Sequence, residues 1–398
     1  MNKKVSLGVT ISAMAIVCAL TFIVTSFISL QRFNNKVQAV KEKAEKYSRL
    51  EALDTYVREH YYQSELDEDG LMNGILKGYV EGLDDPYSVY LTEEEYSAAK
   101  LRDSGRQVGI GITVTQNADG YAEILEVQED SPAENGGLQV GDVIVAVEGK
   151  DLKEAGYEES INKVRGEPDT KVRLTIRRKE KDSEFTITRR DFELKTIKSE
   201  LLEGHIGYIR IRAFRENTDE QFQAAMDDLI ANGADALLFD VRNNGGGLLD
   251  TLQNMLDPLL PEGVIATATY QNGESETVIS SDDVETDLPI VILVNGKSAS
   301  ASELFSASLR DFKNAKLIGT QTYGKGVMQN MVPMPDGGGL NLTVATYQTT
   351  KSECYHGVGL TPDEVVEPSD DTDVDAIDPG TDPQLTAAIA ALSPAASD

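Results

Sequence analysis

The pattern of hydrophobic and polar residues changes several times along the chain, and the first change lies near its start. Residues 5–30 contain no charged side chain. A helix of that length would reach about 39 Å, which exceeds the ~30 Å hydrocarbon core of a membrane. Lys3 and Lys4 precede the run, so we expect a cytoplasmic tip (1–4), an uncleaved single-pass anchor in the cell membrane and an extracytoplasmic remainder. A cleaved signal peptide is the competing interpretation.

Charged residues return after the apolar run, together with a helical periodicity. From Phe33 to Val57 apolar residues recur at steps of three and four, which is typical of one face of a helix. Residues 31–62 are therefore expected to form a stalk that packs on the body or pairs with a second copy of the chain. Residues 63–103 favour short helices, the N-terminal part of the domain described below.

Short alternating segments dominate residues 104–190 and predict a self-contained β-rich domain. A glycine turn near its start, Gly109-Ile110-Gly111-Ile112, leaves backbone N–H groups available. Such a loop can bind the terminal carboxylate of a peptide while the peptide adds as a strand. The alternative is an ordinary turn between strands.

Apolar runs alternate with helical segments in residues 191–366. This order favours an α/β domain with a largely parallel, buried sheet. Residues 367–398 begin as an acidic segment rich in Asp, which predicts a solvated linker, and end in a short helix. The chain is long enough for two or three domains.

The composition excludes several classes of function. A net charge of −30 argues against a nucleic-acid partner. Cys18 lies in the expected anchor and Cys354 near the other end, so neither a disulfide nor a thiolate site is expected. The three histidines have no metal-ligand spacing. No metal or organic cofactor is therefore expected.

Ser300 stands where an apolar strand and turn give way to a helix. With Glu303 it has the spacing of a capping box, a purely structural device. The carboxyl edge of an α/β sheet is nevertheless where sites gather, and the first helical N–H, chiefly that of Ala301, can bind a developing oxyanion. Ser300 is thus either a helix cap or a nucleophile.

A serine nucleophile needs a base, and Lys325 is the stronger candidate. It is flanked by glycines that permit a close approach, but it can act as a base only if its pKa falls below about 10.4. Gln329 could hydrogen-bond its amine. A solvated turn lysine is the alternative. His356 is a weaker candidate because no orienting acid accompanies it.

A glycine-rich turn, Asn243 to Gly247, follows another apolar run. It could offer a second oxyanion N–H, or it could cradle phosphate or a coenzyme A pyrophosphate. Alone it fits neither a P-loop nor a dinucleotide fingerprint.

Taken together, the motifs resemble those of the carboxyl-terminal processing peptidases, tail-specific serine proteases with an embedded PDZ domain. The resemblance covers about residues 60 to 392. It rests on GLDDPYSVYLT before the PDZ domain, SPAENGGLQVGDVIVAVEG within it, LLFDVRNNGGGLL, NGKSASASE and TYGKGVMQ. It implies an α/β protease core of the crotonase/ClpP-like type with an inserted PDZ domain. Gly245 stands where the family usually has proline.

The resemblance also implies roles for individual residues. Ser300 would be the nucleophile and Lys325 the general base, supported by Gln329. The N–H groups of Gly246 and Ala301 would form the oxyanion hole. The loop from Gly109 through Ile110 and Gly111 to Ile112 would hold the carboxylate of a substrate that ends in an apolar residue.

The resulting hypothesis is a membrane-anchored serine endopeptidase that acts on polypeptides with accessible C-termini, forms an acyl-enzyme and needs no cofactor. A homodimer through the stalk or the terminal helices is possible. The alternatives are a non-catalytic PDZ scaffold or ligand-binding relative, and a crotonase-like acyl-CoA enzyme.

Overall fold

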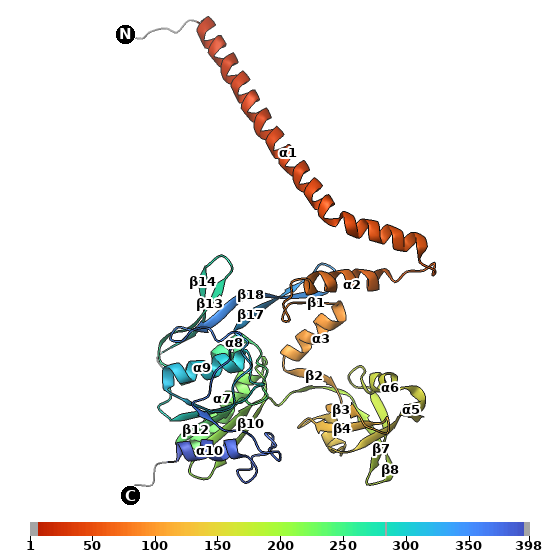
Figure 1. Cartoon of the computed structure of the whole chain (residues 1–398), viewed down its shortest axis with the longest axis vertical. Helices are drawn as coiled ribbons and strands as arrows, with labels where there is room; N and C mark the ends of the chain where they lie inside the picture. Colours follow the sequence, from red (N-terminus) through yellow and green to blue (C-terminus); the bar gives the residue numbers. More distant parts are fainter. Residues whose placement is uncertain (1–6, 283–284, 394–398) are drawn as a thin grey trace. The chain divides into compact units, whose positions relative to one another are not determined.

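A computed structural model describes residues 7–282 and 285–393. The chain divides into two compact units, and the boundary along the sequence lies between Gly74 and Ile75. In the first unit, helix α1 (Leu7–His60) runs without a break through the predicted stalk and most of the predicted anchor (Figure 1). Arg58 near its end forms ion pairs with Asp54 and Glu68. Within the described residues no helix is both long and apolar enough to span a membrane, so the predicted anchor is not supported.

The second unit begins within helix α2 (Glu68–Glu81) and continues through strand β1 (Val89–Leu91) into helix α3 (Glu93–Asp103). Thr92 caps α3 in a capping box with Glu95. Strand β2 (Arg106–Gly109) leads into the β-rich domain and pairs antiparallel with the returning strand β9 (Arg190–Glu193).

The predicted β-rich domain is confirmed as a six-stranded antiparallel sheet in the order β3-β4-β5-β7-β8, with β6 beside β5. Its alternating strands bury one face: Ile124, Ile144 and Leu174 are fully buried. Three short helices cover the sheet. The elements are β3 (Ile112–Gln116), β4 (Ala122–Val127), α4 (Pro132–Asn135), β5 (Val143–Val147), β6 (Lys150–Asp151), α5 (Leu152–Ala155), α6 (Tyr157–Val164), β7 (Lys171–Arg178) and β8 (Lys181–Thr188).

The α/β domain contains the largely parallel buried sheet that the sequence predicts. Its order is β10-β11-β12-β15-β16-β19, with only the edge strand β10 antiparallel. Every residue of the central strands is buried, which explains their continuous apolar runs. The strands are β10 (Ile197–Leu202), β11 (Ile206–Ile211), β12 (Ala236–Asp240), β15 (Ile290–Val294), β16 (Lys316–Gly319) and β19 (Glu364–Val365).

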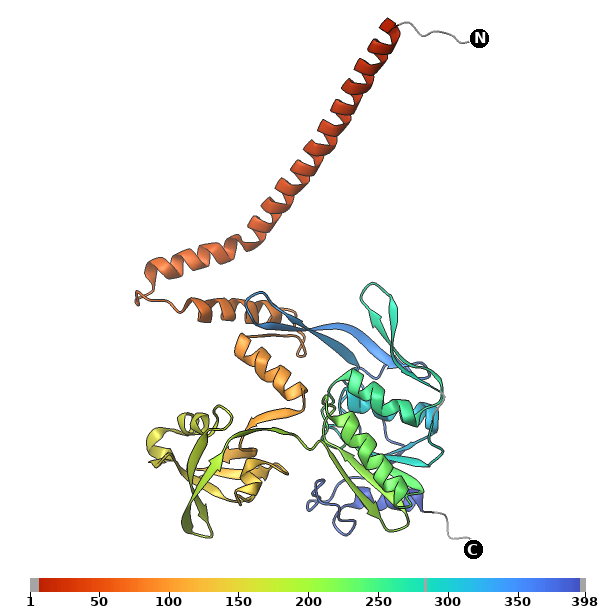
Figure 2. The same ribbon diagram turned by 180° about the vertical axis from the view of Figure 1, so that it is seen from behind.

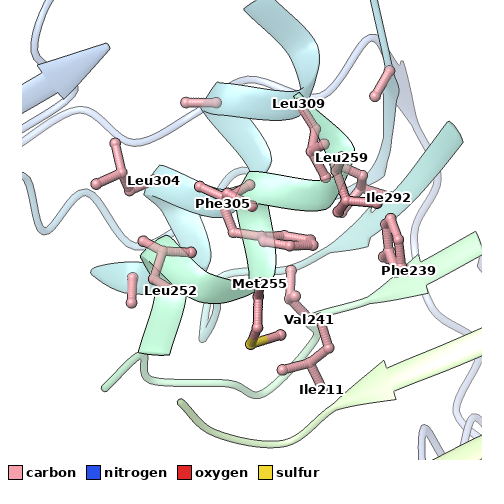
Figure 3. Packing of buried hydrophobic residues seen from close by; sticks show 14 of the residues in the cluster. Ile211, Phe239, Val241, Leu252, Met255, Leu259, Ile292, Leu304, Phe305 and Leu309 are labelled. Carbon is pink, nitrogen blue, oxygen red and sulfur yellow. The ribbon is translucent and has the colours of Figure 1, made fainter. Parts of the chain in front are cut away.

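Helices cover both faces of this sheet (Figure 1, Figure 2). Helices α7 (Thr218–Ala231), α8 (Leu249–Leu256) and α9 (Ala301–Lys313) share one core with the sheet, and α10 (Pro383–Leu392) shares the other. Phe305 of α9 meets Phe239 of β12 edge to face, with ring centroids 5.3 Å apart (Figure 3). This contact fixes the start of α9 against the sheet.

A second sheet packs beside the first core and carries further site residues. Strand β18 is its centre: β17 lines one edge, and β13 and β1 pair along the other. Besides β1, its strands are β13 (Gly263–Tyr270), β14 (Ser275–Ser281), β17 (Val327–Pro333) and β18 (Gly339–Thr349), and the short helix η1 (Asp257–Leu259) connects α8 to β13.

The acidic segment near the C-terminus is not simply a solvated linker, so that prediction is wrong in part. Asp382 is buried and pairs with the buried Arg242 at 2.7 Å. Asp375 pairs with Arg210 at 3.0 Å. A buried guanidinium needs anionic partners, and these arginines lie more than a hundred residues earlier, where no local pattern links them to the segment.

Candidate active site

Ser300 is the residue immediately before helix α9, and its backbone is strained. Its φ of 58° lies in the left-handed region, which residues with a Cβ rarely adopt. Gly246 packs directly against this turn: a Cβ added there would lie 2.8 Å from the Cβ of Ser300. The glycine-rich turn and the Ser300 turn, 54 residues apart in sequence, are therefore in contact, and glycine at position 246 permits it.

The two predicted oxyanion donors differ in their present partners. The Gly246 N–H donates to Asn244 Oδ1 at 2.8 Å, so it is already engaged. The Ala301 N–H is the first of α9, a position that has no acceptor within an α-helix. Asn244 itself is buried and donates to the Ile211 carbonyl, which fixes the turn to the end of β11.

Glu303 connects the backbone of Ser300 with that of Lys325. The predicted capping contact is present: the Ser300 N–H donates to Glu303 Oε2 at 3.0 Å. The Lys325 N–H donates to the same oxygen at 2.8 Å. Oε1 accepts from the Gly324 N–H and the Thr322 hydroxyl. This fully buried carboxylate therefore holds the two turns in register, a function beyond capping.

The Lys325 side chain is half-buried, and burial lowers the pKa of its amine, while the charge of Asp85 acts in the opposite direction. The amine lies 4.7 Å from the centre of the Tyr87 ring, a cation–π distance. Among the hydrogen bonds of the described residues, none joins this amine to the Ser300 hydroxyl. The predicted base thus has a perturbed pKa but is not hydrogen-bonded to the predicted nucleophile.

Among the described residues, the side-chain amide of Gln329 is hydrogen-bonded to partners other than Lys325. Its amide donates to the Thr343 hydroxyl at 3.1 Å and to the Val327 carbonyl. Gln329 and Thr343 are cross-strand partners in β17 and β18, which places their side chains side by side.

Sequence reasoning missed Tyr347, which touches Ser300. Its hydroxyl lies 3.2 Å from Ser300 Oγ and 3.0 Å from the Lys325 carbonyl. Tyr347 is one of several aromatic residues in alternating strands, and no local signal marks it. His356 accepts the Gly326 N–H at Nδ1 and packs against the edge of Tyr87.

Several of the residues described above line one cavity of about 930 Å³. Its walls include Gly246, Ser300, Lys325, Gln329 and Tyr347, together with apolar side chains from α8 and β17. A cavity of this size admits an extended peptide segment. Within the part of the chain that is described, no group of three His, Cys, Asp or Glu residues could hold a metal ion.

Comparisons with known proteins identify the family. The family model for peptidase family S41 matches residues 205–366, that for the PDZ domain matches 123–178, and that for the N-terminal domain of the activating protease CtpB matches 10–95. A carboxyl-terminal-processing protease of Synechocystis is 35% identical over 72% of this chain and 68% of its own. The chain belongs to the carboxyl-terminal processing proteases. It is a serine-type peptidase with a PDZ domain.

A second relative of this carboxyl-terminal processing protease supports the same family, and a solved structure shares the fold. The carboxy-terminal processing protease CtpA of Bacillus subtilis is 34% identical over 80% of this chain and 68% of its own. A solved S41 protease from Bacteroides fragilis shares the fold, with a TM-score of 0.52, 21% identity, and coverage of 79% of this chain and 89% of that one. Neither a scaffold nor an acyl-CoA enzyme is supported.

The predicted carboxylate loop of this protease lies at the start of the PDZ sheet. Gly111 has a φ of 80°, and a Cβ added there would lie 2.3 Å from the Cβ of Ser131. The Ile110 and Gly111 carbonyls accept the N–H groups of Ala133 and Gln128. The loop between Gly109 and Ile112 is thus fixed within the domain, and its role in binding stays a prediction.

Asp85→Asn is expected to shift the pH–activity profile of this protease to lower pH. Although burial opposes ionisation, hydrogen bonds, that of Ser88 foremost, lower the pKa of Asp85, so it is charged beside Lys325. Its charge favours the ammonium form, whereas a base must be neutral. With Lys325 as the predicted base, activity should rise as pH passes the Lys325 pKa. Removing the charge lowers that pKa further, so kcat/KM at neutral pH should rise at least about twofold.

The matched control for this prediction is the neighbouring, exposed Asp84. Asp84→Asn removes an equal charge, and asparagine tolerates its φ of 55°. Its profile should coincide with that of the parent. An Asp85→Asn profile that is unchanged or shifted to higher pH would rule out the predicted effect of Asp85 on Lys325.

Proposed function

We propose that this protease hydrolyses polypeptides through an acyl-enzyme on Ser300, with Lys325 as the general base. The observation that carries the proposal is the shared cavity. The strained Ser300 turn and a lysine amine whose pKa is lowered by burial both line it. A serine needs an activating base, and a desolvated lysine can be that base near neutral pH.

The proposed reaction proceeds in two halves. The neutral amine of Lys325 takes the Ser300 proton, and Oγ attacks the peptide carbonyl carbon. The C–N bond then breaks as the ammonium returns the proton to the leaving amine. Water hydrolyses the remaining ester with Lys325 again as base. The Ala301 N–H supports the oxyanion throughout, at the positive end of the α9 dipole.

Small rearrangements must precede this reaction. The Lys325 amine has to leave the Tyr87 ring and approach Ser300 Oγ. Gly246 can donate to the oxyanion only after its N–H leaves Asn244. Gln329 donates to Thr343 through Nε2, and its Oε1 can accept a hydrogen bond from the amine once the amine approaches. We propose that a bound substrate segment stabilises the rearranged state, because it interacts with that state and not with the present one.

We further propose that the PDZ domain selects substrates by an accessible C-terminus with an apolar last side chain. A backbone loop at a sheet edge suits carboxylate capture combined with strand addition. The extracytoplasmic location and a homodimer also remain proposals. The proposed extracytoplasmic location rests on Lys3 and Lys4, which lie outside the described residues.

Two unfolded polypeptides that differ only in the last residue, valine or aspartate, test this selection. The parent is expected to cleave the valine substrate with a kcat/KM at least about tenfold higher. Gly111→Ala should reduce that preference, because the added Cβ displaces the loop from Ser131.

Equal cleavage of both substrates by the parent would contradict selection by the tail. Cleavage of neither substrate, with or without an added apolar C-terminal peptide, would contradict the proposed peptidase activity itself. The Asp84→Asn variant described above serves as the control for ordinary surface change.

A further inference from the structure

Tyr347 bridges the predicted nucleophile and the predicted base. It lies on β18, where it pairs with Ala268 of β13. The residue before it, Thr346, pairs with Val327 of β17. The Tyr347 side chain is 2% exposed. The phenol oxygen is 3.2 Å from Ser300 Oγ and 3.0 Å from the Lys325 carbonyl oxygen. It therefore contacts the reacting atom itself and also the backbone of the residue proposed to deprotonate it.

The number of protons limits what these two contacts can be at any moment. A phenol has one proton, and a carbonyl oxygen can only accept. While the phenol donates its hydrogen bond to the Lys325 carbonyl oxygen, the Ser300 hydroxyl must be the donor in the contact between the two hydroxyl groups. Once Ser300 has lost its proton, Oγ is an acceptor only, and the phenol is the donor within reach. The geometry therefore permits the phenol to change its acceptor from the Lys325 carbonyl oxygen to Ser300 Oγ.

We propose that Tyr347 is a catalytic residue that donates its hydrogen bond to Ser300 Oγ as Lys325 removes the Ser300 proton. The inference rests on the proposed roles of Ser300 and Lys325. The proton of Ser300 moves to the Lys325 amine, whereas Tyr347 keeps its own proton and only turns it from the Lys325 carbonyl to Oγ. No further reactant is needed.

A hydrogen bond from Tyr347 to Ser300 Oγ should stabilise the transition state more than the ground state. A hydrogen bond to an ionised oxygen is roughly twice as strong as one between neutral groups. Only interactions that strengthen in the transition state raise kcat. Burial raises the pKa of the Tyr347 phenol, so it remains a protonated donor across the working pH range.

Tyr355 provides a matched control within the same cluster. Its ring lies 6.1 Å from that of Tyr347, edge to face, and it is similarly buried. Its hydroxyl interacts with the Tyr347 phenol, and among the described residues no hydrogen bond joins it to Ser300. Tyr355→Phe thus deletes an equivalent oxygen from the same core without touching Ser300.

The test compares the full-length parent with Tyr347→Phe, Tyr355→Phe, Ser300→Ala and Lys325→Met. Two readouts are used: kcat and KM on an unfolded polypeptide ending in valine, and the rate at which a fluorophosphonate labels Ser300. Tyr347→Phe is expected to lower kcat about 10- to 100-fold and slow labelling comparably, with KM within about twofold. Tyr355→Phe should stay within about twofold of the parent in both.

The outcomes separate this inference from the proposed function. If Ser300→Ala or Lys325→Met retains activity, the proposed dyad fails. If both are inactive while Tyr347→Phe keeps or exceeds the parent kcat and labelling rate, only the role of Tyr347 fails. If urea unfolding shows that Tyr347→Phe is not folded, 4-aminophenylalanine at position 347 replaces it. This weaker donor of similar size should lower kcat, and an unchanged kcat would overturn the inference.

Discussion

Ser300→Ala and Lys325→Met are each expected to lower kcat by at least about 10³-fold, and the double variant no further than the slower single one. Residues that act as one unit show such non-additivity. Without Oγ no acyl-enzyme can form. Without the amine the proposed base for the Ser300 proton is missing. Steady-state cleavage of an unfolded polypeptide with an apolar last residue measures each loss.

His356→Ala is the control for the choice of base. The imidazole accepts the Gly326 N–H and packs against Tyr87, but it makes no contact with Ser300 among the described interactions. Its removal should leave catalysis largely intact. If His356→Ala abolishes cleavage while Lys325→Met preserves it, the base has been misassigned.

Glu303→Gln is expected to lower activity about 100-fold and the free energy of unfolding by about 3 kcal/mol. The carboxylate accepts four hydrogen bonds, from Ser300, Thr322, Gly324 and Lys325. An amide keeps one accepting oxygen and directs its NH₂ at N–H or O–H donors. Because the site is fully buried, water cannot compensate. The Ser300 and Lys325 turns would then lose their common register.

The control for Glu303 is Glu95, the equivalent capping residue of α3. Glu95 accepts the Thr92 N–H in a capping box but lies at the surface. Glu95→Gln should change the free energy of unfolding by less than about 1 kcal/mol and leave kcat unchanged. Urea unfolding and steady-state kinetics report both quantities. Equal effects at the two positions would show that Glu303 is only a cap.

Local patterns predicted much of the fold, because they reflect local physics. The alternation of polar and apolar residues in 104–190 matches a sheet buried on one face, and the apolar run before Asn295 matches a strand buried on both. Ser300 and Glu303 were predictable as the start of a helix. Capping and catalysis need not compete at this helix start. The Glu303 carboxylate accepts the Ser300 N–H as a cap and also accepts the Lys325 N–H.

The unpredicted features depend on contacts between distant segments. Tyr87 and Tyr347 meet Lys325 and Ser300 from other elements, and neither carries a local signal. Asp382 appeared to be part of a solvated acidic run because its partner, Arg242, lies 140 residues earlier. A spacing along the sequence contains no distance between side chains. For this reason it could not be foreseen that, within the described residues, no hydrogen bond joins the Lys325 amine to Ser300.

The most direct test of the Ser300 acyl-enzyme is to quench turnover with acid and map the modified residue by mass spectrometry. The full-length protein is mixed with an excess of unfolded substrate and stopped before the substrate is consumed. We expect an N-terminal substrate fragment in ester linkage to Ser300, absent from Ser300→Ala. A covalent fragment on any other residue, or full turnover by Ser300→Ala, would contradict the proposed mechanism.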